Sequence, residues 1–170
     1  MEILNWKQKD FSGRKYIVNS ADGQLGKLVF DGWTSYNAVF DSGESSVSFT
    51  SKGWVEQEVT IRYNGEIVGN GITSLLGKSR IEMVSGEKYV LQSKTFSQKQ
   101  VLTDVAGKSV ISFEQPAFGF GKGQILIADG VSELTKLALV STGLYFKTVS
   151  DSQVAILIAI FTPIFLQIIR

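Results

Sequence analysis

The chain has 170 residues, with 17 basic and 16 acidic side chains, a net charge of +1, and neither cysteine nor histidine. Without those two residue types, disulfides, thiolate or imidazole metal sites, cysteine nucleophiles and histidine-based triads are all excluded. The balanced charge argues against nucleic acid as a partner, because such binding needs a strongly basic face.

Serine–lysine or carboxylate chemistry and an all-oxygen Ca²⁺ or Mg²⁺ site remain possible in such a chain. No group of residues that would form either is identified, so no catalytic residue, metal site or cofactor is expected. The N-terminal residues 1–7 lack the basic region and apolar core of a signal peptide. A cytoplasmic location is therefore expected.

The densest basic cluster of the chain follows and consists of Lys7, Lys9, Arg14 and Lys15. Near an anionic lipid surface each basic side chain contributes about 1 kcal/mol. The cluster is therefore a candidate site for lipid or anion binding. The alternative interpretation is an ordinary solvated surface, which Asp10 within the cluster favours.

Glycine-centred turn signals recur about every ten residues, a spacing typical of an all-β sandwich or barrel. Between the turns lie segments rich in Val, Ile, Phe, Tyr and Thr, which favour strands. The expected strands are Lys15–Asn19, Leu25–Phe30, Ser35–Phe40, Ser46–Thr50, Ser79–Val84, Lys88–Gln92, Gln100–Thr103, Ser109–Phe113 and Gln124–Ala128.

The clearest strand signal is the alternation of apolar and polar residues over Val55–Tyr63. Asn64-Gly65 follows and supplies two residues that accept positive φ, as a type I′ hairpin turn requires. The chain is then expected to return antiparallel over Glu66–Gly69. With this hairpin, the total is about eleven or twelve strands.

The stretch Ala117–Gln124 is the most glycine-dense of the chain. Its backbone could form a nest for an anion, with Lys122 adding positive charge, so Lys122 is a further candidate anion-binding residue. The alternative is a hairpin loop without a ligand. The stretch is not a P-loop, because no Gly-Lys-Ser/Thr follows at the required spacing.

Thr135–Val149 is compatible with a strand pair turning at Ser141–Gly143 or with a poorly periodic helix. Gly143 and the β-rich run Leu144–Val149 favour the strands.

Val154–Arg170 is apolar on every side, so either protein or lipid must surround it. As a helix, Val154–Ile169 is about 24 Å long, less than the roughly 30 Å of a bilayer core. Twelve strands closed into a barrel leave an interior that wall side chains alone do not fill, and a helix about 10 Å wide would occupy it. Asp151-Ser152 would cap such a helix.

We therefore expect one domain over residues 1–170, a closed antiparallel barrel of about twelve strands around a buried helix over 152–169. The alternative is a C-terminal membrane anchor attached to a cytoplasmic β domain.

Many short strands followed by a hydrophobic C-terminal helix resemble the tubby-like barrel superfamily. That superfamily includes the tubby C-terminal domain, the phospholipid scramblases and the LURP-one-related proteins of plants. The similar stretches are Lys15–Phe30 (KYIVNSADGQLGKLVF) and Leu144–Phe161 (LYFKTVSDSQVAILIAIF). The resemblance implies a non-enzymatic protein that associates with lipid. Asp151 alone does not make the acidic Ca²⁺ region of scramblases, so no functional residue is carried over.

The expected function is thus a non-catalytic binding module for lipid head groups or another anionic surface, with an anionic membrane as partner. A tail-anchored membrane protein is the second hypothesis. The third is an enzyme that uses an oxygen-ligated metal. The sequence leaves the oligomeric state open.

Overall fold

A computed structural model describes residues 1–53, 56–74, 78–93, 98–116 and 121–168, of which 93, 133–134, 154 and 156–168 are described as backbone only. The elements are β1 (Glu2–Gln8), β2 (Lys15–Ser20), β3 (Gly23–Phe30), β4 (Ala38–Asp41), β5 (Ser46–Lys52), β6 (Gln57–Tyr63), β7 (Glu66–Thr73), β8 (Ser79–Met83), β9 (Lys88–Ser93), β10 (Lys99–Asp104), β11 (Ser109–Glu114), β12 (Lys122–Ile127) and α1 (Glu133–Ile168).

The twelve strands form a closed antiparallel barrel, as the spacing of the turns predicts. Each strand pairs with the next one along the chain, and β1 pairs with β12 to close the wall. The hairpin between β6 and β7 is confirmed, because Asn64 and Gly65 have φ values of 47° and 89°. Its first residue in the prediction, Val55, lies outside the described residues.

Strand β1 was not among the predicted strands, although its residues alternate clearly. Leu4 and Trp6 are buried in the lumen, whereas Ile3, Asn5 and Lys7 are exposed on the outer face. Because β1 is the strand that meets β12, the wall is complete only with this segment.

Asn70-Gly71, one of the glycine-centred signals that predict turns in the sequence, lies inside β7. A Cβ atom at Gly71 would lie 2.2 Å from Cζ of Phe146, so the glycine makes room for a helix side chain. The predicted strand Ser35–Phe40 also begins later, at Ala38, because residues 31–37 form a loop.

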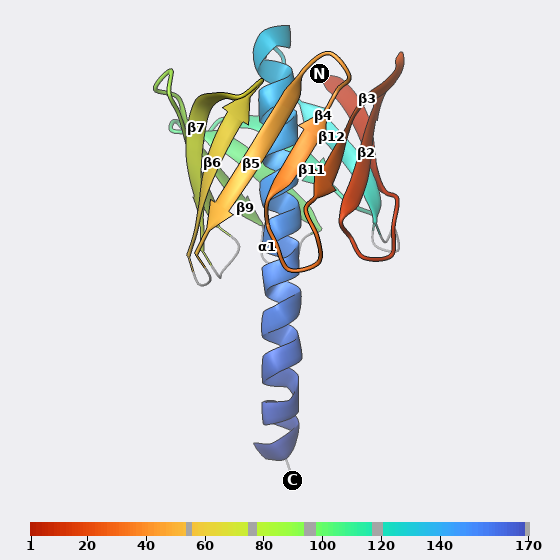
Figure 1. Cartoon of the computed structure of the whole chain (residues 1–170), viewed down its shortest axis with the longest axis vertical. Coiled ribbons are helices and arrows are strands. Elements are labelled where there is room, and N and C mark those ends of the chain that lie inside the picture. The colour runs from red at the N-terminus through yellow and green to blue at the C-terminus, as the bar shows by residue number, and fades with distance from the viewer. Residues whose placement is uncertain (54–55, 75–77, 94–97, 117–120, 169–170) are drawn as a thin grey trace.

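Helix α1 runs through the middle of the barrel (Figure 1). Its lumen side chains are buried against the inward-facing residues of the wall. Tyr145 stacks on Phe49 with ring centroids 4.3 Å apart and on Phe30 at 5.6 Å. Its hydroxyl donates a hydrogen bond of 2.8 Å to the carbonyl of Tyr36. The apolar helix residues buried in the lumen are Ala138, Leu139, Val140, Leu144, Tyr145, Phe146 and Val149.

The interpretation of Thr135–Val149 as a strand pair is wrong, because this segment is helical and fills the lumen. Gly143 is not a turn residue. A Cβ atom there would lie 2.6 Å from Cζ of Phe113, so the missing side chain allows the helix to pass this ring. Wall surrounds the segment, and its apolar residues therefore show no helical stripe.

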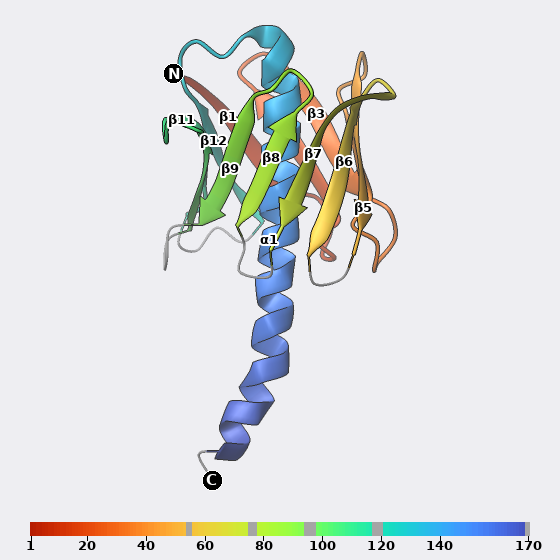
Figure 2. The ribbon, with the colours of Figure 1, turned by 90° about the vertical axis from the view of Figure 1, so that its left-hand side faces the viewer.

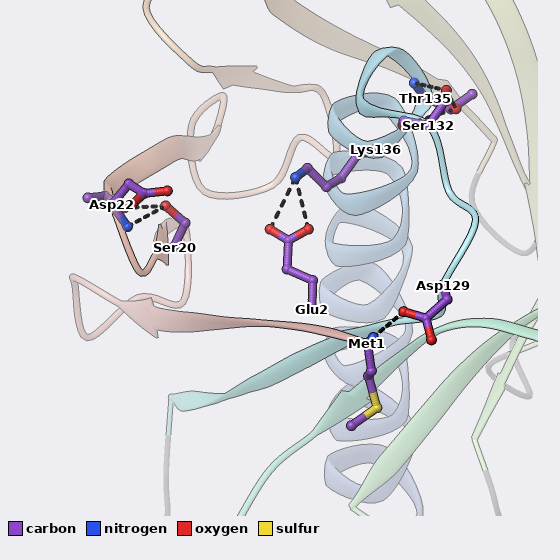
Figure 3. Close-up of polar contacts among 9 residues, drawn as sticks. Met1, Glu2, Ser20, Asp22, Asp129, Ser132, Thr135 and Lys136 are labelled. Atoms are coloured by element: carbon purple, nitrogen blue, oxygen red, sulfur yellow. Dashed lines mark hydrogen bonds and ion pairs between the residues drawn. The ribbon is translucent and has the colours of Figure 1, made fainter.

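The start of the helix also differs from the prediction of 152–169. Ser132 caps the start of α1, since its carbonyl accepts from the Lys136 backbone N–H at 2.8 Å and its Oγ from that of Thr135 at 3.3 Å. Figure 3 shows this first turn. Asp151, expected as part of the cap, lies well inside the helix. The last buried side chain of the described residues is Gln153, so residues 138–153 are the central part.

Beyond Gln153 the helix leaves the barrel, and both views show it continuing away from the wall (Figures 1 and 2). We call residues 154–168 the tail of α1; at 1.5 Å per residue it is about 22 Å long. We call the end of the barrel from which it emerges the exit end. There β1 and β3 end and β2 and β4 begin, joined by the loops 9–14 and 31–37.

Candidate functional site

Four of the five predicted lipid- or anion-binding residues form an exposed cluster at the exit end. Three neighbouring strands, β12, β1 and β2, supply it together with the loop 9–14. We call this group the lysine cluster; its members are Lys7, Lys9, Lys15 and Lys122. Residues more than 100 positions apart in the chain meet here because β1 and β12 close the barrel.

The register of the strands places like charges opposite one another. Lys7 and Lys122 are direct cross-strand partners, and the Lys9 backbone N–H donates to the carbonyl of Lys15 at 2.8 Å. Like charges directly opposite on one face destabilise a sheet. Within the described part of the chain, no carboxylate lies within 4.0 Å of these four ammonium groups. The four ammonium groups therefore lie at the surface without a direct carboxylate partner among the described residues.

Two hollows adjoin the lysine cluster and share Lys7 and Lys122. The larger, about 610 Å³, is also lined by Asn5, Asn19 and Gln124, whose amides can donate hydrogen bonds. The smaller, about 340 Å³, includes Lys9. Ammonium and amide donors around an open hollow suit a phosphate or carboxylate group. The carboxylate that lines the larger hollow, Glu114, is already paired with Lys99.

Arg14, the fifth predicted residue, has a different role. It is half-buried, and its Nε donates to the carbonyl of Gly32 at 2.9 Å while Nη2 donates to that of Ser35. Its guanidinium also lies 5.1 Å from the ring centroid of Phe30 and 5.9 Å from that of Tyr36. These contacts tie the loop 9–14 to the loop 31–37. Arg14 thus braces the exit end.

Asp10, which seemed to weaken the basic cluster, instead orders the loop that carries it. Its carboxylate accepts from the backbone N–H groups of Arg14 and Lys15, both at 3.0 Å, and from the Ser12 hydroxyl. Burial acts to raise the pKa of Asp10, but these hydrogen bonds outweigh it and hold that pKa below its usual value. The carboxylate is therefore occupied by its own loop.

The glycine-dense stretch around Lys122 is tested only in part, because residues 117–120 lie outside the described residues. Gly121 has a φ of 66°, and its carbonyl accepts from the Gln8 backbone N–H at 2.6 Å. The anion nest predicted there stays a prediction.

An ion pair between a buried lysine and a half-exposed aspartate on α1 was missed from the sequence. Lys147 is 6% exposed, and its Nζ lies 2.5 Å from the carboxylate of Asp151 one helical turn later. Gln100 donates to the other oxygen of Asp151 at 2.7 Å, and the Trp6 ring centroid lies 4.7 Å from the ammonium. The spacing of Lys147 and Asp151 four residues apart is the signal that could have indicated this pair and the helix.

The opposite end of the barrel has mixed charge. Lys136 of α1 pairs with Glu2 of β1 at 2.9 Å, and the N-terminal ammonium pairs with Asp129 (Figure 3). A hollow of about 650 Å³ at this end is lined by acidic and basic side chains together, including Glu87, Lys88, Asp104 and Lys108. Such a lining favours neither sign of ligand charge.

Comparison of the chain with models of known families, with curated proteins and with solved structures found no match. The resemblance to the tubby-like barrel superfamily therefore stays a prediction. Among the described residues, no three acidic side chains gather into a group that could hold a metal ion. In that same described part, no helix is long and apolar enough to cross a bilayer.

Proposed function

We propose that this protein is a non-catalytic, membrane-attached binding module that sits on an anionic lipid surface with its exit end toward the lipid. The observation behind this proposal is that the apolar tail of α1 and the lysine cluster lie at the same end of the barrel. The tail of α1, which has no charged residue in its sequence from Val154 to Ile168, leaves the barrel at the end that bears the lysine cluster.

The tail supports the proposal through its composition. Apolar side chains on all faces of a helix need an apolar environment, and outside the barrel lipid provides one. A helix of about 22 Å enters the hydrocarbon region without needing to reach its far side. The tail would thus attach the barrel to the membrane.

The lysine cluster supports an anionic partner. Lysine side chains close to a membrane surface are attracted to anionic head groups, which are concentrated on the cytoplasmic leaflet. Phosphate groups would also relieve the repulsion between Lys7 and Lys122. A cytoplasmic barrel facing that leaflet accounts for both the charge and its position.

The test compares vesicles with and without anionic lipid. The variant K7Q/K9Q/K15Q/K122Q removes the lysine cluster, and K27Q/R62Q/K88Q/K108Q removes the same charge from exposed or half-exposed positions elsewhere. At about 1 kcal/mol per lysine, the first variant should lose roughly 10²- to 10³-fold of the preference for anionic vesicles at low salt. The second should keep most of that preference.

Addition of salt should weaken the preference of the unchanged protein, since screening is strong beyond about 8 Å at physiological ionic strength. Equal losses for the two variants would show that net charge alone acts and would overturn the assignment to the cluster. For the tail, flotation with neutral vesicles should require residues 154–168. If the chain ending at Gln153 floats equally well, the tail is not the attachment.

A further inference from the structure

Two large hydrophobic side chains project into solvent from the loops at the exit end. Phe11, in the loop 9–14, is fully exposed, and Trp33, in the loop 31–37, is 82% exposed. Isolated exposed hydrophobic residues are common on protein surfaces and need no explanation. These two differ because the structure fixes both loops and places them at the end of the barrel from which the tail of α1 emerges, next to the strands that carry the lysine cluster.

The loop 9–14 is ordered by its own hydrogen bonds. Asp10 accepts from the backbone of Arg14 and Lys15 at 3.0 Å each, and Gly13 supplies a φ of 68°. Phe11 therefore lies on an ordered turn, and its exposure does not come from a loose chain. Lys9 and Lys15 flank this turn on either side, so the aromatic ring is bordered by positive charge.

The two loops form one unit through Arg14. Its guanidinium donates to the carbonyls of Gly32 and Ser35, which lie on either side of Trp33 in the chain. The same group lies against the rings of Phe30 and Tyr36. The distance between the loops that carry Phe11 and Trp33 is therefore set by the fold.

The unit is also joined to the helix. Tyr145, buried in the lumen, donates a 2.8 Å hydrogen bond to the carbonyl of Tyr36 in the loop 31–37. Tyr36 in turn lies beneath the Arg14 guanidinium. Because these contacts connect α1 with both loops, the position of the loops relative to the tail is fixed. A membrane that holds the tail would therefore contact the loops at a defined depth.

We propose that Phe11 and Trp33 enter the head-group region of a lipid bilayer and set the orientation of the barrel on it. This inference rests on the proposed function, since it takes the membrane to be on the exit side. Aromatic rings are favoured at the boundary between lipid and water, and the neighbouring lysines would contact phosphate groups. The tail and the two loops would then give three points of contact, which fix the tilt of the barrel.

The absence of cysteine allows a direct test with the full-length protein. Single variants F11C and W33C, labelled with an environment-sensitive fluorophore, report the exit end. V84C and V105C, at positions 72% and 80% exposed near the opposite end, are the matched controls. With anionic vesicles, labels at 11 and 33 should shift to the blue and be quenched by lipid-attached quenchers, whereas labels at 84 and 105 should not respond.

A second measurement uses unlabelled serine variants and compares their affinity for anionic vesicles. F11S/W33S should bind anionic vesicles about tenfold more weakly per side chain removed, while V84S/V105S should bind like the unchanged protein. Protein that does not float with vesicles at all overturns the proposed function and this inference together. Protein that floats while the labels at 11 and 33 stay aqueous, or while all four labels respond alike, overturns the orientation alone.

Discussion

The tail of α1 should be dispensable for folding, whereas the preceding part of the helix should not. Six large apolar side chains of α1 lie in the lumen, and burial of each contributes about 1.5 to 3 kcal/mol. Together they amount to about 9 to 18 kcal/mol, as much as the whole free energy of unfolding of a domain, about 5 to 15 kcal/mol. The six are Leu139, Val140, Leu144, Tyr145, Phe146 and Val149.

A chain that ends at Gln153 keeps all six side chains and should unfold cooperatively, with a free energy of unfolding within about 1 kcal/mol of the full-length value. A chain that ends at Leu137 loses them and should not fold. Urea unfolding followed by circular dichroism, in the same mild detergent for each chain, measures both. If the chain ending at Gln153 is unfolded or aggregated, residues 138–153 do not suffice to fill the lumen, and the barrel needs the tail to fold.

Three further changes probe the interior. Gly71→Ala should lower the free energy of unfolding by about 1 to 3 kcal/mol, because the new methyl group meets the Phe146 ring. Thermal denaturation measures this loss, and an unchanged midpoint would contradict the contact. Asp151→Ala should cost about 1 to 3 kcal/mol in urea unfolding, because it leaves the buried Lys147 ammonium without its half-exposed partner. Lys147→Met should cost less, and the reverse order would contradict the dependence of Lys147 on Asp151. Burial raises the pKa of Tyr16 to about 12, so the folded state holds its proton longer than the unfolded chain does and stability should fall by about 2 kcal/mol as pH rises from about 10 to 12. Tyr16→Phe should reduce this loss of stability between about pH 10 and 12. An unaltered slope of the free energy of unfolding against pH would show that other groups cause the loss.

The wall of the barrel was predictable because its signals are local. Asn64-Gly65 specifies a hairpin through backbone conformation alone, and most turns between strands contain a similar glycine. The first strand was missed even though Leu4 and Trp6 alternate with polar or exposed residues. Its identity as a strand depends on β12, more than 100 residues later, and alternation over so short a segment does not reveal that partner.

The helix was harder to predict because its environment removes the usual signal. Helical periodicity is visible when one face meets water, and residues 138–150 meet the wall on every side. In the sequence, Gly143 and the β-rich run 144–149 favoured strands here, and the charged Lys147 finds its partners Asp151 and Gln100 only in the folded barrel. The tail looked more like a core because it lacks such residues. The sequence thus suggested the wrong half of the helix for the lumen.

The candidate site was predictable in composition and not in arrangement. The run from Lys7 to Lys15 is visible in the sequence, but Lys122 joins it only because β12 lies beside β1. Arg14 looked equivalent to its neighbours until its contacts with two loop carbonyls were known. Phe11 carried no sequence signal, since the exposure of an aromatic residue depends on the loop that presents it.

The pairing of β1 with β12 has a consequence for assembly. Among the twelve described strands it is the one junction between segments distant in the chain, so the first strand waits for the last before the wall is continuous. Lys7 and Lys122 face each other across that junction, and the repulsion between their charges destabilises the pairing of β1 with β12. An anion bound between them would stabilise this pairing, and its binding would raise the free energy of unfolding of the barrel. The β1–β12 pairing would therefore be less stable in a molecule released from an anionic membrane than in one attached to it.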